Sequence, residues 1–265
     1  MIDVHCHLNF HAFEKDVDLV IKKAIADGVK KIINVGTSIE SSEKAIELSK
    51  RYDNLYAIVG VHPHHADKVE KGFDVELEKL AKNQKVVAIG ETGIDYYSYK
   101  SNAIVDRKLQ KEVFLKQIEL SLKLKLPLQI HNRLAGKEIV EIIEDYKDEL
   151  LDPPGMFHCM SGNIEFLKKV LDLGFYVGFD GNITYEGIAK GEDTALSELV
   201  KYAPIERIVT ETDAPFLTPQ PFRGSRNVPS YVILVGQFIA KIKALPFKEV
   251  EIATSKNAEK IFNLK

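Results

Sequence analysis

The feature that most constrains the fold is a repeated alternation of apolar segments with segments of helical periodicity. Eight mostly apolar segments are predicted to be strands, at residues 1–9, 31–36, 56–61, 86–90, 126–130, 155–157, 175–179 and 207–212. Apolar residues at helical spacing follow them, at residues 13–27, 41–51, 75–83, 106–124, 136–146, 164–173, 194–202, 229–243 and 247–262. Strands this apolar are buried on both faces, as in a parallel sheet that helices cover.

Eight strand–helix units in 265 residues predict an α/β fold, a (β/α)8 TIM barrel, with a doubly wound open sheet as the alternative. No linker or low-complexity tract interrupts the pattern. We therefore expect residues 1–265 to form a single TIM-barrel domain.

Polar side chains with metal-binding capacity stand at the carboxyl ends of the predicted strands, where TIM barrels carry their active sites. These residues are His5, His7, His62, Glu91, His131, His158 and Asp213. If polar residues merely marked strand ends, a mixture with Ser, Asn and Lys would be expected instead. The composition therefore predicts a metal centre.

The spacing of these residues favours a centre with two divalent ions. His5 and His7 share one face of their strand, because alternate residues of a strand point the same way. This many nitrogens and carboxylates suit two ions about 4 Å apart, which share a carboxylate and an activated water. Glu91 is the expected bridge, and Asp213 is expected to bind one ion and take the proton from the water. Histidine-rich ligation favours Zn, Mn, Co or Fe over Mg, and availability decides which is bound, so two ions of Mg, Mn or Zn are expected.

Six ordered motifs resemble those of the TatD family of metal-dependent deoxyribonucleases, within the amidohydrolase superfamily. They are His5–Asn9, Gly60–His64, Gly90–Tyr97, Ile130–Arg133, His158–Gly162 and Glu211–Leu217, and Ser255–Phe262 also fits. The resemblance implies a phosphodiester hydrolase with 3′ to 5′ exonuclease action on single-stranded ends. It also implies metal ligation by His5, His7, Glu91, His131, His158 and Asp213. Two positions depart from the family pattern: Val228 replaces a glutamate and His65 replaces an aspartate.

Several residues near the predicted strand ends are candidates for substrate binding. The planar guanidinium of arginine suits phosphate, and aromatic rings that follow Glu91 can stack on a base. Structural roles, such as solvated loop arginines or packed tyrosines, are the alternative for each. The candidates are His62, His64, Asp95, Tyr96, Arg133, Arg223 and Arg226.

The net charge of −3 indicates no strongly basic surface for binding long nucleic acid. The family resemblance implies that the substrate is nucleic acid, with single-stranded DNA ends expected. The same ligands could instead serve an amidohydrolase that opens acyl esters or amides, such as an aminoacyl-tRNA deacylase. A non-enzymatic metal-binding module is a third reading. Cys6 and Cys159 are expected to be buried thiols of a reducing compartment. No signal peptide or membrane span is visible, so a cytoplasmic location is expected.

Overall fold

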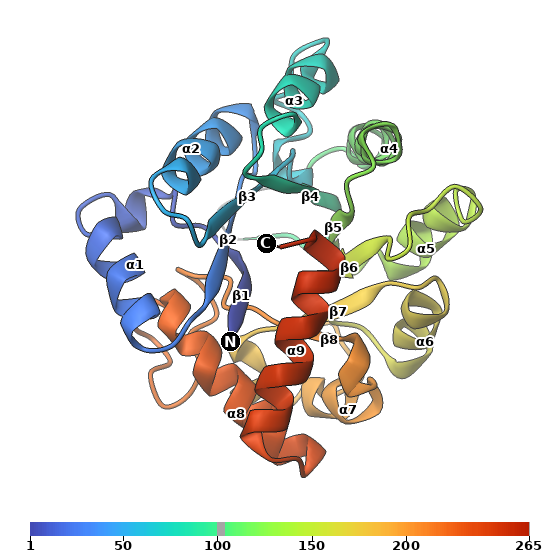
Figure 1. The fold of residues 1–265 in the computed structure, drawn as a ribbon. Helices are drawn as coiled ribbons and strands as arrows, with labels where there is room; N and C mark the ends of the chain where they lie inside the picture. The colour runs from blue at the N-terminus through green and yellow to red at the C-terminus, as the bar shows by residue number, and fades with distance from the viewer. Residues whose placement is uncertain (100–103, 265) are drawn as a thin grey trace.

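In this computed structural model, which describes residues 1–99 and 104–264, eight parallel strands form one sheet in sequence order. The strands are β1 (Ile2–Cys6), β2 (Lys31–Val35), β3 (Leu55–Val59), β4 (Val86–Asp95), β5 (Leu128–Arg133), β6 (Gly155–Phe157), β7 (Tyr176–Phe179) and β8 (Ile208–Thr210). The chain after β8 returns to β1, where Cys6 and Ala214 form a parallel bridge and His7 N donates to Ala214 O at 2.7 Å. The predicted TIM barrel is thereby confirmed (Figure 1).

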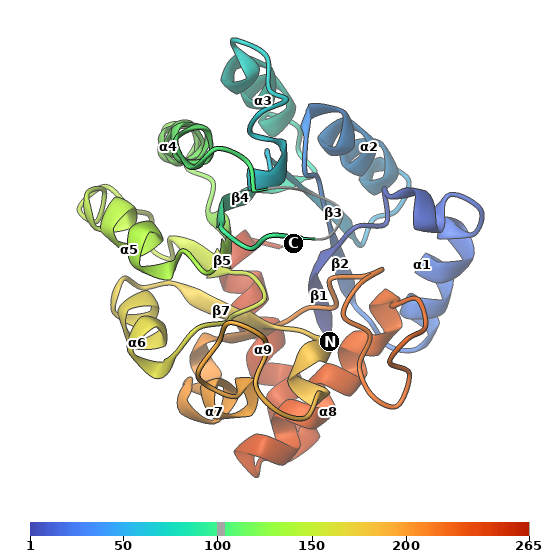
Figure 2. The same cartoon turned by 180° about the vertical axis from the view of Figure 1, so that it is seen from behind.

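Helices surround the strands, and the last helix crosses one end of the barrel (Figure 1). They are α1 (Val17–Ala26), α2 (Ile39–Lys50), α3 (Phe73–Ala81), α4 (Arg107–Leu124), α5 (Gly136–Glu144), α6 (Ile164–Asp172), α7 (Leu196–Tyr202), α8 (Val232–Lys243) and α9 (Phe247–Phe262). The apolar face of α9 packs against the end of the barrel at which the strands begin, because Ile261 and Phe262 share one core cluster with Ile2 and Val4. The carboxyl ends of the strands therefore form the open end, which Figure 2 shows from the opposite side.

Strand β4 extends five residues beyond its predicted end, and this extension shapes the open end of the barrel. Its last residues pair with β5, with Gly93 opposite His131 and Asp95 opposite Arg133. The sequence predicted an end at residue 90 because the polar Glu91 and Thr92 interrupt the apolar run. Both are buried all the same, because Glu91 faces His5 inside the barrel and Thr92 Oγ1 accepts a hydrogen bond from Gln117 Nε2 of α4 at 2.7 Å.

The two cysteines are free, and they differ in burial. Cys6 is buried as predicted, and its thiol lies against Ile33 O at 3.5 Å. Cys159 is only partly buried, so the prediction of two buried thiols is wrong for this residue. It lies beyond the end of β6, with φ of 45°, so it does not follow the strand alternation on which that prediction rested.

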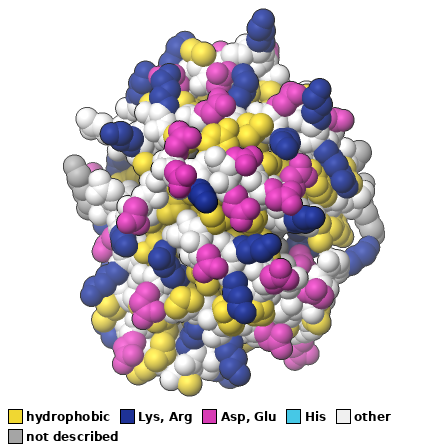
Figure 3. All heavy atoms as spheres, turned by 90° about the vertical axis from the view of Figure 1, so that its right-hand side faces the viewer, with side chains coloured by type: hydrophobic (Ala, Val, Ile, Leu, Met, Phe, Trp, Pro, Cys, Tyr) yellow, Lys and Arg dark blue, Asp and Glu magenta, His cyan; other side chains and the backbone are white. Residues whose placement is uncertain are grey.

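Charged side chains of both signs are interspersed over the face shown in Figure 3, which is the right-hand side of Figure 1. This agrees with the small net charge. Within the described part of the chain, no single helix is long and apolar enough to cross a membrane. One pair, Pro229–Lys243 with Phe247–Phe262, reaches the required length only together and bends by 114°.

Candidate metal centre

Strand β1 presents two histidines to the open end of the barrel. His5 and His7 are both buried, and their Nε2 atoms lie 3.0 Å apart. Asp213 Oδ1 lies 3.6 Å from His5 Nε2 and 3.4 Å from His7 Nε2. These three residues form one group whose ligand atoms could hold a metal ion.

Glu91, from β4, lies between this group and a second set of histidines. Its Oε2 is 3.6 Å from His5 Nε2 and 3.7 Å from His7 Nε2. Its Oε1 is 2.8 Å from His131 Nδ1 and 3.8 Å from His158 Nε2. The two carboxylate oxygens thus face two different histidine groups, which is the arrangement that a carboxylate shared by two ions requires.

Hydrogen bonds at the far ring nitrogen indicate which histidines suit metal ligation. A ligating imidazole normally donates its other N–H to a carbonyl or carboxylate, which leaves a lone pair free for the metal. His7 Nδ1 lies 3.0 Å from Val35 O, and His158 Nδ1 lies 3.1 Å from Glu211 Oε1. His131 Nε2 lies 3.2 Å from Asp95 Oδ2, which leaves Nδ1 toward Glu91. The donor set present therefore fits divalent ions.

His62 differs from the other histidines near Glu91. Its Nδ1 accepts a hydrogen bond from His64 N at 3.1 Å, so the neutral ring carries its proton on Nε2. That Nε2 lies 3.4 Å from Glu91 Oε1. Although His62, Glu91 and His131 are close enough to form a metal-binding group, this tautomer makes His62 a hydrogen-bond donor at the site and not a ligand.

Without an ion, protonated histidines balance the buried carboxylates. Burial alone would lower the pKa of His131, but Asp95 and Glu91 raise it to about 9. Burial likewise opposes the charged form of His158, and Glu211 beside it raises its pKa to about 10. Burial would raise the pKa of Glu91, but the nearby His62, His131 and His5 hold it well below its usual range. Metal binding at neutral pH must therefore displace protons from the histidines.

Glu211 is a site residue that the sequence analysis missed. Its side chain is fully buried, and Oε1 accepts from Cys159 N at 2.6 Å and faces His158 Nδ1. Its ligand atoms also lie close to those of His5 and His158. A signal existed in the sequence, because Glu211 precedes Asp213 by two residues at the carboxyl end of a predicted strand. Its carboxylate orients His158 from behind.

We expect Glu211→Gln to weaken divalent-metal binding by about 10- to 100-fold, the usual effect of losing a carboxylate behind a ligating histidine. The amide can still accept from Cys159 N, but it no longer holds a negative charge beside His158 Nδ1. Calorimetric titration of metal-free protein with Mn²⁺ and Zn²⁺ measures the change. Glu165→Gln, which alters an exposed carboxylate on α6, is the matched control. Equal affinities in wild type and Glu211→Gln would contradict the orienting role.

The candidates for substrate binding fall into two sets. His64 Nε2 lies 3.0 Å from Asp95 Oδ2, beside the metal-binding residues. Asp95 itself is buried, and it accepts from Tyr97 N at 2.8 Å and Tyr99 Oη at 3.1 Å, so it positions these neighbours. Arg133 stacks over Tyr97, with 5.1 Å between the guanidinium carbon and the ring centroid.

Tyr96 and Arg226 have structural partners instead of free functional groups. Tyr96 Oη donates to Glu138 Oε2 at 2.6 Å, and its ring lies under Arg107 at 4.0 Å. Arg226 forms two hydrogen bonds with Asp16, of 2.9 and 2.6 Å, and covers the ring of Phe13. The expectation that Arg226 is free to bind phosphate at the rim is corrected, because its guanidinium is hydrogen-bonded to Asp16. This contact links the loop after β8 to the start of α1.

Arg223 remains exposed at the rim, and it forms no salt bridge with any described residue. Its guanidinium carbon lies 3.9 Å from the ring centroid of Tyr185, which follows β7. The two positions that depart from the family pattern have contacts outside the metal-binding groups. Val228 packs against a core cluster, and His65 Nδ1 lies 2.7 Å from Thr37 O.

Comparison with known proteins relates the whole chain to one family. The family described as "TatD related DNase" matches residues 2–263. YabD of Bacillus subtilis (strain 168), described as an uncharacterized metal-dependent hydrolase, is 38% identical over 264 residues, which cover 100% of this chain and 99% of YabD. YcfH of Escherichia coli (strain K12), described in the same way, is 34% identical over 268 residues, with 100% and 96% covered. The crystal structure of YjjV, a TatD homologue from Escherichia coli K12, has a TM-score of 0.90 at 26% identity, with 100% of this chain and 98% of that chain covered.

Proposed function

The chain belongs to the family of TatD-related DNases and is a metal-dependent hydrolase, and from this premise we propose that it hydrolyses phosphodiester bonds in nucleic acid. The specific activity proposed is that of a deoxyribonuclease that removes nucleotides from single-stranded 3′ ends. The observation that carries the proposal is the position of Glu91, whose two carboxylate oxygens face two separate histidine groups. A pair of ions held in this way suits in-line displacement at phosphorus.

We assign His5, His7 and Asp213 to one divalent ion and His131 and His158 to the other, with Glu91 shared. When bound, such ions polarise the phosphoryl oxygens and lower the pKa of water beside them. The proposed ions are Mg²⁺, Mn²⁺ or Zn²⁺. Asp213, whose side chain is 14% exposed, can accept the proton of the attacking water at a carboxylate oxygen.

Three side chains are proposed to hold the phosphodiester. His62 offers the proton on Nε2 to a phosphoryl oxygen. Arg133 has a buried Nε with no partner among the described residues, so its guanidinium has a donor to offer. Arg223 offers an unpaired positive charge at the rim, where its guanidinium can bind phosphates of the substrate strand.

Hydrolysis of an acyl ester, such as that of an aminoacyl-tRNA, is the second candidate. Water activated by ions at this site could attack a carbonyl carbon as well as phosphorus, so the metal ligands do not separate the two reactions. The arginines favour a substrate that carries phosphate over a simple neutral ester. An aminoacyl-tRNA also carries phosphates, so an assay has to separate it from DNA. The expected location, a reducing cytoplasm, stays a prediction from the sequence.

The test is a metal-dependence assay with several substrate classes in parallel. Metal-free protein is reconstituted with Mg²⁺, Mn²⁺ or Zn²⁺ and given 3′- and 5′-labelled single-stranded DNA, RNA and a panel of p-nitrophenyl esters. Release of single nucleotides from the 3′ end of DNA supports the proposal. Metal-dependent cleavage of carboxylic esters with no release from either nucleic acid would favour the acyl hydrolase instead.

Arg223→Ala should raise KM for a single-stranded oligonucleotide about tenfold and change kcat less, because a rim arginine binds phosphate alike in the ground and transition states. Arg226→Ala is the matched control, since it removes an arginine from the same loop whose guanidinium is held by Asp16, and it should leave KM unchanged. Steady-state kinetics of both variants decide the matter. A collapse of kcat at constant KM in Arg223→Ala would mean that this arginine acts on the transition state.

A further inference from the structure

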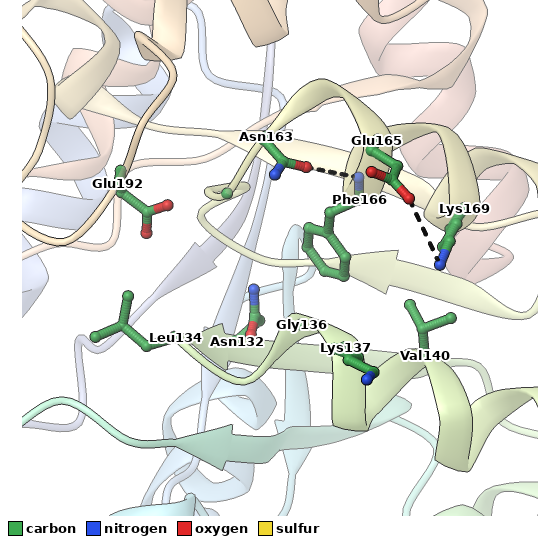
Figure 4. A pocket seen from close by; sticks show the side chains of 11 residues that line it. Asn132, Leu134, Gly136, Lys137, Val140, Asn163, Glu165, Phe166, Lys169 and Glu192 are labelled. Carbon is green, nitrogen blue, oxygen red and sulfur yellow. Dashed lines mark hydrogen bonds and ion pairs between the residues drawn. The ribbon is translucent and has the colours of Figure 1, made fainter.

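A groove with a volume of about 300 Å³ lies between the first turns of α5 and α6, beside the metal centre. Asn132 and Leu134 line it from the end of β5, and Asn163 and Phe166 line it from the other side (Figure 4). Successive residues of a strand point to opposite faces. Since His131 faces Glu91 inside the barrel, the neighbouring Asn132 faces outward, so this groove is separate from the metal-binding residues and adjoins them.

The groove has an aromatic floor that two glycines accommodate. A Cβ at Gly136 would lie 2.9 Å from ring atoms of Phe166, and one at Gly162 would lie 3.0 Å from the same ring. Any larger residue at either position would displace the ring. Leu134, 43% exposed, extends at the rim (Figure 4). A flat aromatic floor with an apolar rim suits a flat ligand.

Two amide groups supply unused hydrogen-bond donors in this groove. Asn132 is only 9% exposed, and its Oδ1 accepts from Ala135 N at 3.2 Å, but its Nδ2 has no partner within the part of the chain that the structure describes. Asn163 caps α6 by accepting from Phe166 N at 2.9 Å, which leaves its NH2 group available. Figure 4 shows the two amide nitrogens on opposite sides of the groove, both directed toward the space beside Phe166. A side chain that is nine-tenths buried and directs a free donor into a groove suits a ligand that carries acceptors.

The charges around the groove favour a neutral ligand. Lys137 and Lys169 are matched by Glu165 and Glu192, so the lining side chains carry no net charge. Lys169 Nζ lies 4.0 Å from Glu165 Oε1, and Lys137 Nζ lies 3.8 Å from Glu141 Oε1. A phosphate would have to approach these carboxylates. A flat, neutral group with ring acceptors meets no such repulsion.

We propose that this groove binds one unstacked nucleobase of the substrate strand, near the nucleotide that is cleaved. The inference rests on the proposed function, because the strand bound in the groove is the nucleic acid that is cleaved at the metal centre. The groove is then a second binding site for that strand. The base stacks on Phe166, and its ring acceptors receive hydrogen bonds from Asn132 and Asn163. A volume near the lower end of small-molecule sites suits a single base. Stacking of this kind tolerates any sequence.

The experiment combines abasic nucleotides in the substrate with a substitution in the groove. Single-stranded oligonucleotides carry one abasic residue, moved position by position from the 3′ end, and KM is measured for each. In wild type, one abasic position should raise KM about tenfold, the scale of one lost stacking contact. Asn132→Asp keeps the acceptor for Ala135 N and replaces the unused NH2 donor by a charged oxygen. It should raise KM for the intact strand similarly, and the abasic residue should then make little further difference.

Asn83→Asp is the matched control, because Asn83 Oδ1 also accepts a backbone N–H, from Lys85 at 3.1 Å, and Asn83 lies between α3 and β4 and does not line the groove. It should show the full abasic effect. The inference is overturned if no abasic position changes KM, or if Asn132→Asp keeps the wild-type abasic effect.

A second readout needs no cleavage. The same strands carry a fluorescent label, and their affinities for metal-free protein are measured by fluorescence anisotropy. If wild type binds the strands with the expected abasic dependence and never cleaves them, the proposed nuclease activity fails while the base-binding groove stands. Cleavage with no abasic dependence in either readout would leave the nuclease and remove the groove. Absence of both binding and cleavage would overturn both.

Discussion

Replacing Asp213 by asparagine should lower kcat for a single-stranded oligonucleotide at least about 100-fold, the scale of general-base loss. The carboxylate lies 3.4 Å from His7 Nε2 and 3.6 Å from His5 Nε2, and its side chain is partly open to solvent. Asparagine keeps the size and one oxygen for a metal ion, but it cannot accept the proton of the attacking water. We therefore expect Asp213→Asn to retain at least one ion and to bind the strand.

Folding should not limit this test. Asp213 has φ of 53°, in the left-handed region that most residues avoid, and asparagine tolerates that region as well as aspartate does. Thermal unfolding of the metal-free proteins checks this, and Asp148→Asn, which alters an exposed carboxylate in the segment between α5 and β6, serves as the control for the loss of a carboxylate. Turnover near that of wild type, at full metal content, would mean that another group takes the proton. Glu91 would then be the remaining candidate, since His62 holds its proton on Nε2.

Glu91→Gln should lose metal as well as activity, with affinity for divalent ions more than about 100-fold weaker, beyond the usual effect of losing a group that only orients a ligand. The two oxygens of Glu91 face different histidine groups. An amide presents one oxygen and one NH2 group, so it must turn a donor toward His5 and His7 or toward His131. It also lacks the charge that a group shared by two cations supplies.

Metal content after dialysis and kcat, measured side by side in Glu91→Gln and Asp213→Asn, separate the two roles. We expect Glu91→Gln to be poor in metal, and Asp213→Asn to hold metal while it turns over slowly. High metal concentration should restore part of the activity of Glu91→Gln and none of the activity of Asp213→Asn. Full metal content in dialysed Glu91→Gln would contradict the shared position of this carboxylate.

The sequence by itself determined the barrel and the grouping of the histidines. A parallel sheet brings the carboxyl ends of its strands to one edge, so a residue at a strand end is placed by the topology alone. This placement by topology applies to four histidines, His5, His7, His131 and His158. It also applies to Glu91, although the predicted strand ended before this residue. Their positions do not depend on the course of any loop.

Only the tertiary structure decided the partners of side chains in loops and on the outer layer. Arg223 and Arg226 lie three residues apart in one loop, yet one reaches Tyr185 and the other is held by Asp16, over 200 residues earlier in the chain. No local pattern encodes such a choice, because a long side chain in a loop takes whichever partner the packing brings within reach. The same holds for Tyr96, whose hydroxyl donates a hydrogen bond to Glu138. It also holds for the groove around Asn132, which exists only because α5 and α6 begin side by side.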